Sequence, residues 1–198
     1  MLRKRLITTL TINNGILFRT KLFEPDYRYT MNFIDTWSVD EIIILDITRE
    51  PTGSRQRFLE TITGLAKNCF VPLTCGGGIR TLEDARRLFA AGADKIVVNT
   101  GALEKPELIT EIARVFGKQA VILSIDTKEV AKGDYRVFSH FGRKLHKLRP
   151  WDWAKQGQKL GAGEVLITSI DRDGSLEGYD LDLTHRVTNS IRVPVLVL

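Results

Sequence analysis

Short apolar runs recur along the chain, and most are separated by stretches in which apolar residues return every three or four positions. The runs predict β-strands that are covered on both faces, because several are near-continuous in Val, Ile and Leu. The stretches between them predict amphipathic helices. The predicted strands are Arg5–Ile12, Glu41–Ile47, Val71–Cys75, Lys95–Val98, Ala120–Ile125, Glu164–Ser169 and Val193–Leu198. The predicted helices are Gln56–Lys67, Thr81–Ala91, Pro106–Phe116 and Trp153–Leu160.

The two halves of the chain share this pattern. Lys4–Thr11 matches Gln119–Asp126, and Glu41–Thr48 matches Glu164–Asp171. Alternating strands and helices favour a parallel sheet, and two half-barrels of four strands each would close into a (β/α)8 TIM barrel. We therefore expect one α/β barrel domain over residues 1–198, with half-barrels at about 1–116 and about 117–198. Because only about seven strands are predicted, we expect the barrel to be C-terminally incomplete.

The stretch Pro72–Thr100 carries the clearest chemical signal. An apolar strand opens into a triple glycine that includes Gly77 and Gly78, and a helix follows. Consecutive glycines before a helix bring backbone N–H groups close to a helix N-terminus, which favours binding of a phosphate or another anion. Asn99 and Thr100 end the next strand and would reach the same rim. The alternative is that the glycines only form a tight turn.

Composition limits the class of protein. The chain has 198 residues, of which 43% are hydrophobic and 27% charged, so it can bury a core. It has no apolar run of transmembrane length and no signal-peptide pattern, and Cys69 and Cys75 have neither metal-site nor disulfide spacing. We expect a cytoplasmic protein without metal, cofactor, membrane or nucleic acid. The basic segment Arg143–Arg149 is interpreted as a solvated loop, because no aromatic residues are spaced along it.

Several segments are more specific than this general pattern. They are Met1–Arg5, Asp40–Thr48, Cys75–Ile79, Gly92–Thr100, Ser124–Asp126, Gly161–Gly174 and Gly178–Asp180. Together they resemble the cyclase subunit of imidazole glycerol phosphate synthase, a TIM barrel of histidine biosynthesis. The resemblance implies a glutaminase partner at the N-terminal face and passage of its ammonia through the barrel core. It also implies that the ammonia attacks a bis-phosphorylated ribulosyl aminoimidazole-carboxamide nucleotide, giving imidazole glycerol phosphate and aminoimidazole-carboxamide ribotide.

Four charged residues stand near the starts of predicted strands, namely Arg5, Glu41, Lys95 and Glu164. Inward-facing side chains at these positions would meet in a ring, in which two cations and two anions satisfy one another. The resemblance implies that the four residues form the gate of the ammonia channel and that Asp94 lies where the partner docks. The alternative is a purely structural salt-bridge cluster.

The opposite rim is where the resemblance places the chemistry. Such a cyclisation needs one carboxylate to donate protons and one to accept them. Asp126 matches the catalytic aspartate of the family, but Thr11 stands at the repeat-related position of the second carboxylate, and Asn14 replaces another. A threonine hydroxyl does not ionise near neutral pH, so we expect weak cyclisation. For Asp126 the alternative is a carboxylate that only caps the following loop.

Other residues at this rim are candidates for binding phosphate or substrate. They are Gly77, Gly78, Asn99, Thr100, Asp46, Thr48, Thr168, Ser169 and Asp173. The segment Lys21–Thr30, which in the family folds over the substrate, is shorter here. His140, His146 and His185 have no spacing typical of a metal site or a nucleophile, and are interpreted as surface or loop residues.

Three functions therefore stay open. The first is the lyase reaction of the family in histidine synthesis, with Asp126 as the surviving acid–base residue. The second is a paralogue that feeds ammonia, with a third amidotransferase protein, to an acetamidino sugar of a surface polysaccharide; Asn14–Tyr27 resembles that subgroup. The third is a non-catalytic scaffold for the glutaminase, which an intact channel disfavours. On the chemistry of Thr11 and Asn14 alone, the second is favoured.

Overall fold

The structure is a computed structural model that describes residues 4–28, 39–49 and 54–198. The parallel strands are β1 (Ile7–Asn13), β4 (Glu41–Asp46), β5 (Leu73–Gly76), β6 (Lys95–Val98), β7 (Val121–Ala131), β10 (Glu164–Ser169) and β11 (Val195–Val197). The strands that extend them are β2 (Ile16–Lys21), β3 (Glu24–Arg28), β8 (Asp134–Ser139) and β9 (Lys144–Leu145). The helices are α1 (Ser54–Ala66), α2 (Leu82–Ala90), α3 (Thr100–Glu104), α4 (Glu107–Phe116), α5 (Pro150–Leu160) and α6 (Leu181–Thr188).

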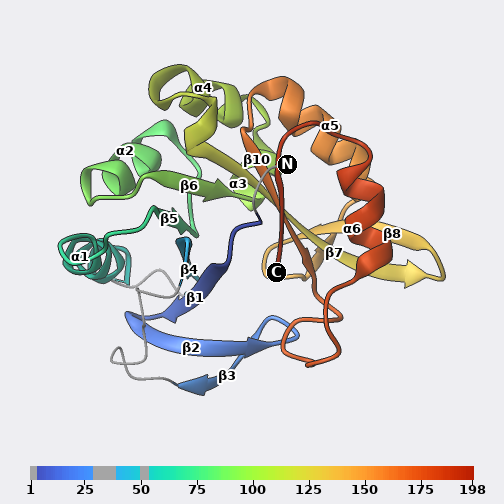
Figure 1. The fold of residues 1–198 in the computed structure, drawn as a ribbon, viewed down its shortest axis with the longest axis horizontal. Helices are drawn as coiled ribbons and strands as arrows, with labels where there is room; N and C mark the ends of the chain where they lie inside the picture. Colours follow the sequence, from blue (N-terminus) through green and yellow to red (C-terminus); the bar gives the residue numbers. More distant parts are fainter. Residues whose placement is uncertain (1–3, 29–38, 50–53) are drawn as a thin grey trace.

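The strands form one sheet, in the order β11-β10-β7-β6-β5-β4-β1-β2-β3, with β8 and β9 attached beside β7. From β11 to β1 all pairings are parallel. This part of the sheet curls around a common axis, and the helices cover its outside (Figure 1). Among the described residues, β11 pairs only with β10. The arrangement confirms the predicted α/β fold, a TIM-barrel architecture that is curled but not closed.

The apolar residues of the strands form two layers, one on each face of the curled sheet. The layer inside the curl consists of Ile43, Val97, Ile122, Leu166 and Leu196, with Ile7 and Leu45 packed against it. The larger outer layer joins the strands to the helices, and includes Ile44, Ile96 and Ile125 from strands and Leu88 and Trp153 from helices. Because both faces are covered, consecutive strand residues are apolar, which is why the strands read as near-continuous runs.

The helix after the triple glycine starts at a defined point because of a local capping motif. The Thr81 side chain accepts a hydrogen bond from the backbone N–H of Asp84, at 3.1 Å. The Asp84 carboxylate in turn accepts one from the backbone N–H of Thr81, at 2.9 Å. This capping box satisfies N–H groups that the first turn of α2 leaves without helical partners.

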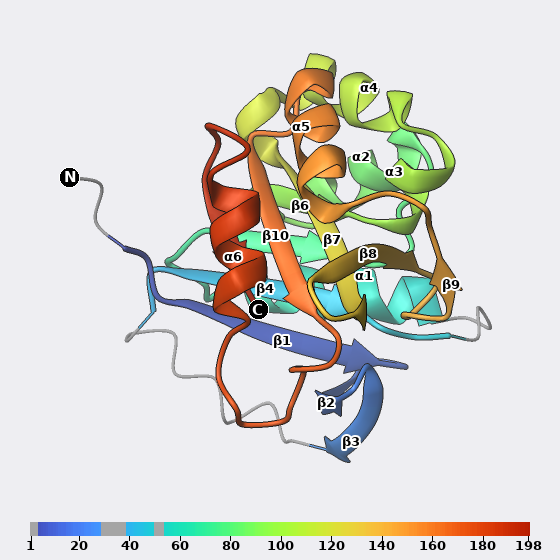
Figure 2. The same cartoon turned by 90° about the vertical axis from the view of Figure 1, so that its right-hand side faces the viewer.

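The antiparallel strands β2, β3, β8 and β9 were not predicted. β1 turns into β2 at Asn14–Gly15, where φ is 51° and 78°, and β7 turns into β8 after Ala131. Asn-Gly is a frequent sequence for a two-residue hairpin turn because both positions need positive φ. The sequence carries this signal at Asn14-Gly15. The hairpin formed by β2 and β3 lies beside the end of β1, away from α4 and α5 (Figure 2).

The remaining boundaries differ in smaller ways. β7 runs on past the expected end at Ile125, because its last residues pair with β8. The short helix α3 and the helix α6 were also not predicted. Two of the segments discussed above are only partly described by the structure. Residues 29–30 of Lys21–Thr30 and residues 1–3 of Met1–Arg5 lie outside the described residues.

Two glycines in helices test the packing of the outer layer. A Cβ atom built on Gly157 in α5 lies 2.2 Å from Cδ2 of Leu123, which is fully buried, whereas one built on Gly64 in α1 meets nothing within 4 Å. We expect Gly157→Ala to lower the free energy of unfolding by about 1–3 kcal/mol through overpacking. Gly64→Ala, its matched control, should raise it by about 0.5–1 kcal/mol, because alanine favours the helix. Urea unfolding followed by circular dichroism measures both; equal effects would contradict the packing described.

Candidate functional site

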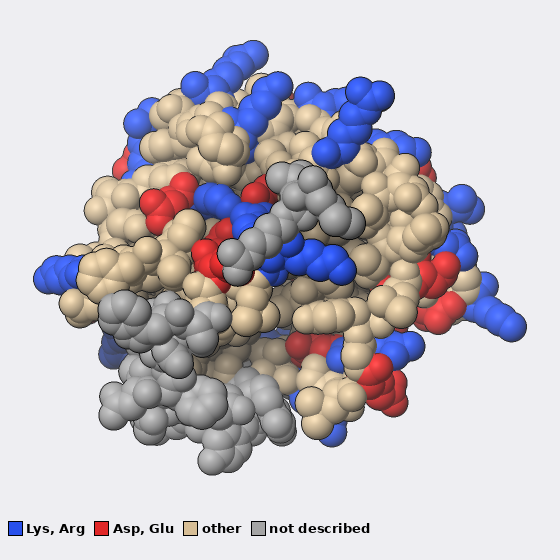
Figure 3. All heavy atoms as spheres, viewed as in Figure 1, with Lys and Arg blue, Asp and Glu red and all other residues tan. Residues whose placement is uncertain are grey.

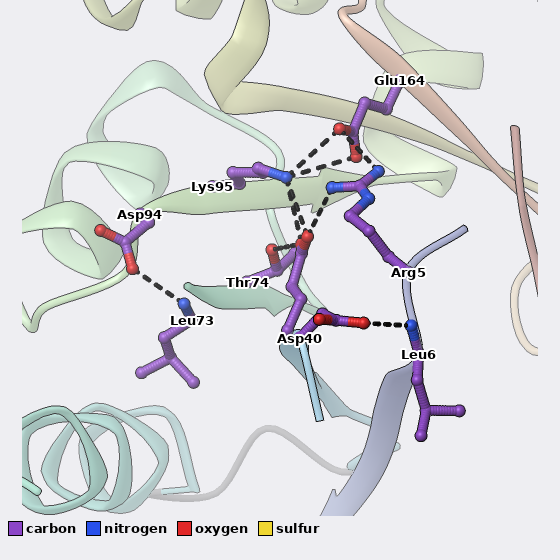
Figure 4. A network of polar contacts seen from close by, with 9 residues as sticks. Arg5, Leu6, Asp40, Leu73, Thr74, Asp94, Lys95 and Glu164 are labelled. Carbon is purple, nitrogen blue, oxygen red and sulfur yellow. Dashed lines mark hydrogen bonds and ion pairs between the residues drawn. The ribbon is translucent and has the colours of Figure 1, made fainter. Parts of the chain in front are cut away.

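Four charged side chains meet at the N-terminal ends of the parallel strands (Figure 4). Arg5 donates hydrogen bonds to Glu41 Oε2 at 2.8 Å and to Glu164 Oε1 at 3.0 Å. Lys95 Nζ lies 3.0 Å from Glu41 Oε2 and 3.3 Å from Glu164 Oε1. The Thr74 hydroxyl donates to Glu41 Oε1 at 2.7 Å. We call Arg5, Glu41, Lys95 and Glu164 the charge ring.

The charge ring has a formal charge of zero, and its two carboxylates are buried. Glu41 is 1% exposed and Glu164 is 9% exposed. Carboxylates at this depth are tolerated only when cations and hydrogen-bond donors surround them, and each of these two contacts both Arg5 and Lys95. The structure therefore brings together the four residues that the sequence suggested, and adds Thr74, for which the sequence carried no signal. Their role as an ammonia gate stays a prediction.

Two further carboxylates on this face accept hydrogen bonds from backbone N–H groups near the starts of strands. Asp94 is exposed, and its carboxylate accepts a hydrogen bond from the backbone N–H of Leu73 at 2.8 Å (Figure 4). The Asp40 carboxylate accepts one from the backbone N–H of Leu6 at 2.8 Å. Figure 3 shows acidic and basic side chains side by side near the centre of the face seen in Figure 1, and further basic side chains spread along its rim over α4 and α5. A docking role for Asp94 stays a prediction.

A cavity of about 210 Å³ lies at the opposite, C-terminal ends of the strands. Most candidate residues of that rim line it, namely Thr11, Asp46, Gly77, Gly78, Asn99, Thr100, Asp126, Thr168 and Asp173. Thr48 and Ser169 are not among the lining residues: the Thr48 hydroxyl accepts a hydrogen bond from the backbone N–H of Asn14, and Ser169 is buried. The parallel strands thus gather residues from separate sequence segments at one rim, as expected for this fold.

Asp126 has the properties of a group that exchanges protons near neutral pH. Its Oδ2 accepts a hydrogen bond from Asn99 Nδ2 at 2.6 Å, and its Oδ1 lies 3.4 Å from the Ser124 hydroxyl. Burial in the cavity raises the pKa of Asp126 to about 7; the two hydrogen bonds act against this shift, and the negative charge of Asp173 adds to it. A carboxyl group with this pKa serves as an acid or a base near neutrality.

Thr11 lines the same cavity, but its side chain is a hydroxyl group rather than a carboxyl group. Its hydroxyl donates to the backbone carbonyl of Phe18 on β2, the strand that pairs with β1. The second half of the chain has an equivalent pairing. Thr11 on β1 is paired with Phe18 on β2, and Asp126 on β7 is paired with Phe138 on β8. The repeat-related positions therefore hold an ionisable carboxyl group on one side, and on the other a hydroxyl whose proton is already engaged.

Two glycines beside the cavity, Gly77 and Gly101, have no room for a side chain. A Cβ atom on Gly77 would lie 2.2 Å from the Asp46 carbonyl oxygen, and one on Gly101 would lie 2.2 Å from the Ile79 carbonyl oxygen. Gly77 and Gly78 also have positive φ, of 102° and 62°. Next to them, Asn99 Oδ1 is buried and has no hydrogen-bond partner within the protein. An unsatisfied buried acceptor at a cavity wall suits a hydroxyl or N–H group of a ligand.

The sequence profile of the family described as "Histidine biosynthesis protein" matches residues 10–197. The chain belongs to this family. It is also 39% identical over 201 residues to a protein of Alkaliphilus metalliredigens (strain QYMF) named imidazole glycerol phosphate synthase subunit HisF, and the match covers 99% of this chain and 79% of that protein. The two findings confirm the family resemblance, and make this a HisF-like barrel of the cyclase-subunit type.

In this HisF-like barrel, Asp173 holds a neighbouring hairpin. Its Oδ1 accepts a hydrogen bond from the Thr20 hydroxyl at 3.0 Å, and its Oδ2 accepts one from the backbone N–H of Phe23 at 2.9 Å. Contact with substrate, which the sequence suggested for Asp173, stays a prediction. What the geometry establishes is that this carboxylate ties the loop after β10 to the turn between β2 and β3.

His140 is one of the lining residues that the sequence did not suggest as part of the site. It lies on the turn between β8 and β9, as expected for a loop residue, yet it lines the cavity. Its Nε2 is 3.2 Å from Glu104 Oε1, and its Nδ1 is 2.9 Å from the Ser139 hydroxyl. The contact with Glu104 joins residues 36 positions apart, so no local spacing could have revealed it.

In the described segments of this family member, neither a metal-ligand cluster nor a membrane-spanning helix is found. No group of three or more His, Cys, Asp or Glu side chains there has the geometry to hold a metal ion. None of the helices described is long and apolar enough to cross a membrane.

The charge ring yields a stability prediction. Lys95→Met leaves Arg5 as the only cation beside the two buried carboxylates Glu41 and Glu164. We therefore expect the free energy of unfolding to fall by about 3 kcal/mol. Lys105→Met removes the exposed ion pair with Glu111 and should cost at most about 1 kcal/mol. Urea unfolding at low and high salt measures both. A loss for Lys95→Met no larger than that for Lys105→Met would show that the ring does not depend on its cations.

The raised pKa of Asp126 yields a pH prediction. Between about pH 4 and pH 7 the folded protein holds a proton on Asp126 that the unfolded chain has released, so this group's contribution to stability falls as pH rises through that range. We expect the stability of the unmutated protein relative to Asp126→Asn to decline from about pH 4 to about pH 7 and then level off. Asp152→Asn, at an exposed position, controls for loss of a surface charge. Parallel curves for the unmutated protein and Asp126→Asn would contradict the shift.

Proposed function

We propose that this HisF-like barrel takes up ammonia at the charge ring and delivers it to the cavity, where Asp126 moves protons on a phosphorylated substrate. The observation that supports this most is the order of three features along the same strands. The charge ring lies at the strand starts, the inner apolar layer follows, and the cavity opens at the strand ends. Ammonia entering at one end would thus reach the reactive end without leaving the barrel.

The inner layer favours neutral ammonia as the travelling species. Side chains such as Ile43, Val97 and Leu166 offer no hydrogen bonds, and an ammonium ion would lose its hydration there at a cost of several kcal/mol. Ammonia released close to the face that carries the charge ring, by a glutaminase docked on it, would enter without first dispersing into solvent. The relative named HisF is itself a subunit of a synthase, which supports a partner of this kind.

At the other end, Asp126 is the residue proposed to act on the substrate. Asn99 Nδ2 holds its Oδ2, whereas its Oδ1 has only the long contact with Ser124, so Oδ1 is the oxygen better placed to exchange a proton with substrate. The exposed backbone of Gly77 and Gly78, with Asn99 and Thr100, would hold one phosphate on the same rim. Binding and proton transfer would then take place within one cavity.

Two reactions fit this arrangement. One is the ammonia-dependent formation of imidazole glycerol phosphate from the ribulosyl nucleotide, which the family relationship favours. The other is the supply of ammonia for an acetamidino sugar, with cyclisation weak or lost. The second is favoured by a specific observation: the Thr11 hydroxyl, at the position expected for the second carboxylate, is bound to the Phe18 carbonyl and cannot supply a proton near neutral pH.

Turnover of the ribulosyl nucleotide with excess ammonium, followed by its absorbance change, tests the proposal without a partner protein. If the first reaction holds, the unmutated chain turns over, and Asp126→Asn lowers the rate by about 10²–10⁴-fold. If the second holds, turnover is weak, and Thr11→Asp raises it by restoring a second carboxylate.

Thr63→Asp, at an exposed position on α1, is the matched control and should change nothing. Turnover of the unmutated chain that does not depend on Asp126 would contradict the catalytic assignment. Absence of turnover in every variant would exclude the ribulosyl nucleotide as a substrate.

A further inference from the structure

A chain of polar side chains joins the turn between β8 and β9 to the first half of the barrel. Ser139 is buried, and its hydroxyl lies 2.9 Å from His140 Nδ1 and 2.7 Å from His146 Nε2. On the other side of the His140 ring, Nε2 lies 3.2 Å from Glu104 Oε1 on α3. The Glu104 carboxylate also pairs with Arg80, which follows the glycine-rich loop. We call His146, Ser139, His140 and Glu104 the histidine clasp.

The single hydrogen of the Ser139 hydroxyl determines where the protons of the clasp lie. A hydroxyl group has one hydrogen to donate, so Ser139 donates to one histidine ring and accepts from the other. When both rings are neutral, Glu104 needs a donor, which places the hydrogen of His140 on Nε2. His140 Nδ1 then accepts from Ser139, and His146 donates its Nε2–H to the same hydroxyl. Every contact of the clasp is satisfied in this arrangement.

One further proton on His140 reverses the direction of these hydrogen bonds. Nδ1 becomes a donor to Ser139, whose hydroxyl then donates to His146. The contact with Glu104 changes from a neutral donor on a carboxylate to an ion pair, and charge-assisted hydrogen bonds are the stronger kind. The alternative acceptor of the proton is His146, but burial and the nearby charges of Lys144 and His140 lower its pKa. The clasp therefore favours the proton on His140.

The clasp holds a turn whose backbone is unusual. His140 and Phe141 have φ of 52° and 60°, which is uncommon for residues other than glycine and persists only where surrounding contacts maintain it. The His140 backbone N–H donates to the Thr100 hydroxyl at 3.2 Å, so α3 contacts this turn at two points. Both residues of the turn line the cavity. The contact with Glu104 thus affects how firmly one wall of the cavity stays in place.

Other charged groups near the turn come from several elements. They are Arg80 after β5, Arg49 after β4, Lys144 on β9, and Asp126 and Asp173 in the cavity. The cations keep their charge throughout the range near neutral pH. Asp126, whose pKa burial raises to about 7, changes its charge in the same range as a histidine, so an experiment has to separate the two groups.

We propose that the histidine clasp is pH-sensitive: it fastens the turn between β8 and β9 to α3 when His140 gains a proton, and loosens as pH rises. Histidine changes its charge between about pH 5 and pH 8, so the clasp would respond within that range. The sign follows from the partner, because Glu104 attracts the protonated ring more strongly than the neutral one. This inference goes beyond the proposed function, since the clasp would act on the cavity wall whatever the substrate is.

Hydrogen exchange followed by mass spectrometry measures how often the turn opens. After correction for the intrinsic effect of pH, we expect the backbone N–H groups of residues 139–143 to be protected about two- to fivefold more at pH 5.5 than at pH 8. Glu104→Gln keeps an acceptor for His140 but not the charge, and should abolish the difference. His140→Asn should abolish it as well, and asparagine tolerates the positive φ of this position.

Glu111→Gln is the matched control, because it removes an exposed ion pair of the same kind, with Lys105, on the neighbouring helix α4. It should leave the pH difference in the turn unchanged. His146→Gln and Asp126→Asn should also retain the difference, since the proposal places the responding proton on His140.

Three results would overturn the inference. One is equal protection of the unmutated turn at both pH values. Another is a pH difference that survives in Glu104→Gln or in His140→Asn. The last is a difference that disappears in Glu111→Gln, His146→Gln or Asp126→Asn, which would assign the response to general charge or to another group. None of these results concerns turnover, so the proposed function is tested separately.

Discussion

Charge neutralisation at the start of the strands is the constraint on which the rest of this barrel depends. Glu41 is almost fully buried, and a carboxylate at that depth is stable only with cations and donors around it. Arg5, Lys95 and Thr74 provide them from three different elements, which fixes how β4, β5 and β6 stand relative to the segment before β1. The same contacts hold the N-terminal ends of these strands together, next to the apolar layer inside the curl.

At the other end, the balance of burial and hydrogen bonding decides what the polar groups can do. Asp126 sits in a cavity that disfavours its charged form, and two hydrogen bonds only partly offset the effect, which leaves its pKa close to neutrality. Thr11 and Asp173 line the same cavity, but each is engaged with the hairpin of β2 and β3. The cavity thus contains one carboxyl group whose pKa is close to neutrality, while Thr11 and Asp173 make structural contacts.

The two halves of the chain contribute related parts to this cavity. β1 continues into β2 and β3, and β7 continues into β8 and β9, and each extension ends in a turn that brings a phenylalanine to the cavity. Asp173 and Arg49 hold these turns from the loops after β10 and β4. The internal repeat is therefore visible not only in the strands but also at their C-terminal ends, where two hairpins border the same cavity.

The sequence by itself determined the parallel strands, most of the helices and the four members of the charge ring, because apolar runs, helical periodicity and charges at strand starts are local signals. It also placed Asp126 and Thr11 at related positions, since both end matching segments. It did not determine β8, β9 or α6, because the alternation of Tyr135 with Val137 and the spacing of Leu183 and Val187 are too short to be unambiguous. It also could not place His140 beside Glu104. Only the tertiary structure decided three further features, because burial and contacts between distant segments arise only when the sheet curls. They are the pKa of Asp126, the hydrogen bond from Thr11 to Phe18 and the hydrogen bond from Arg49 to Phe23.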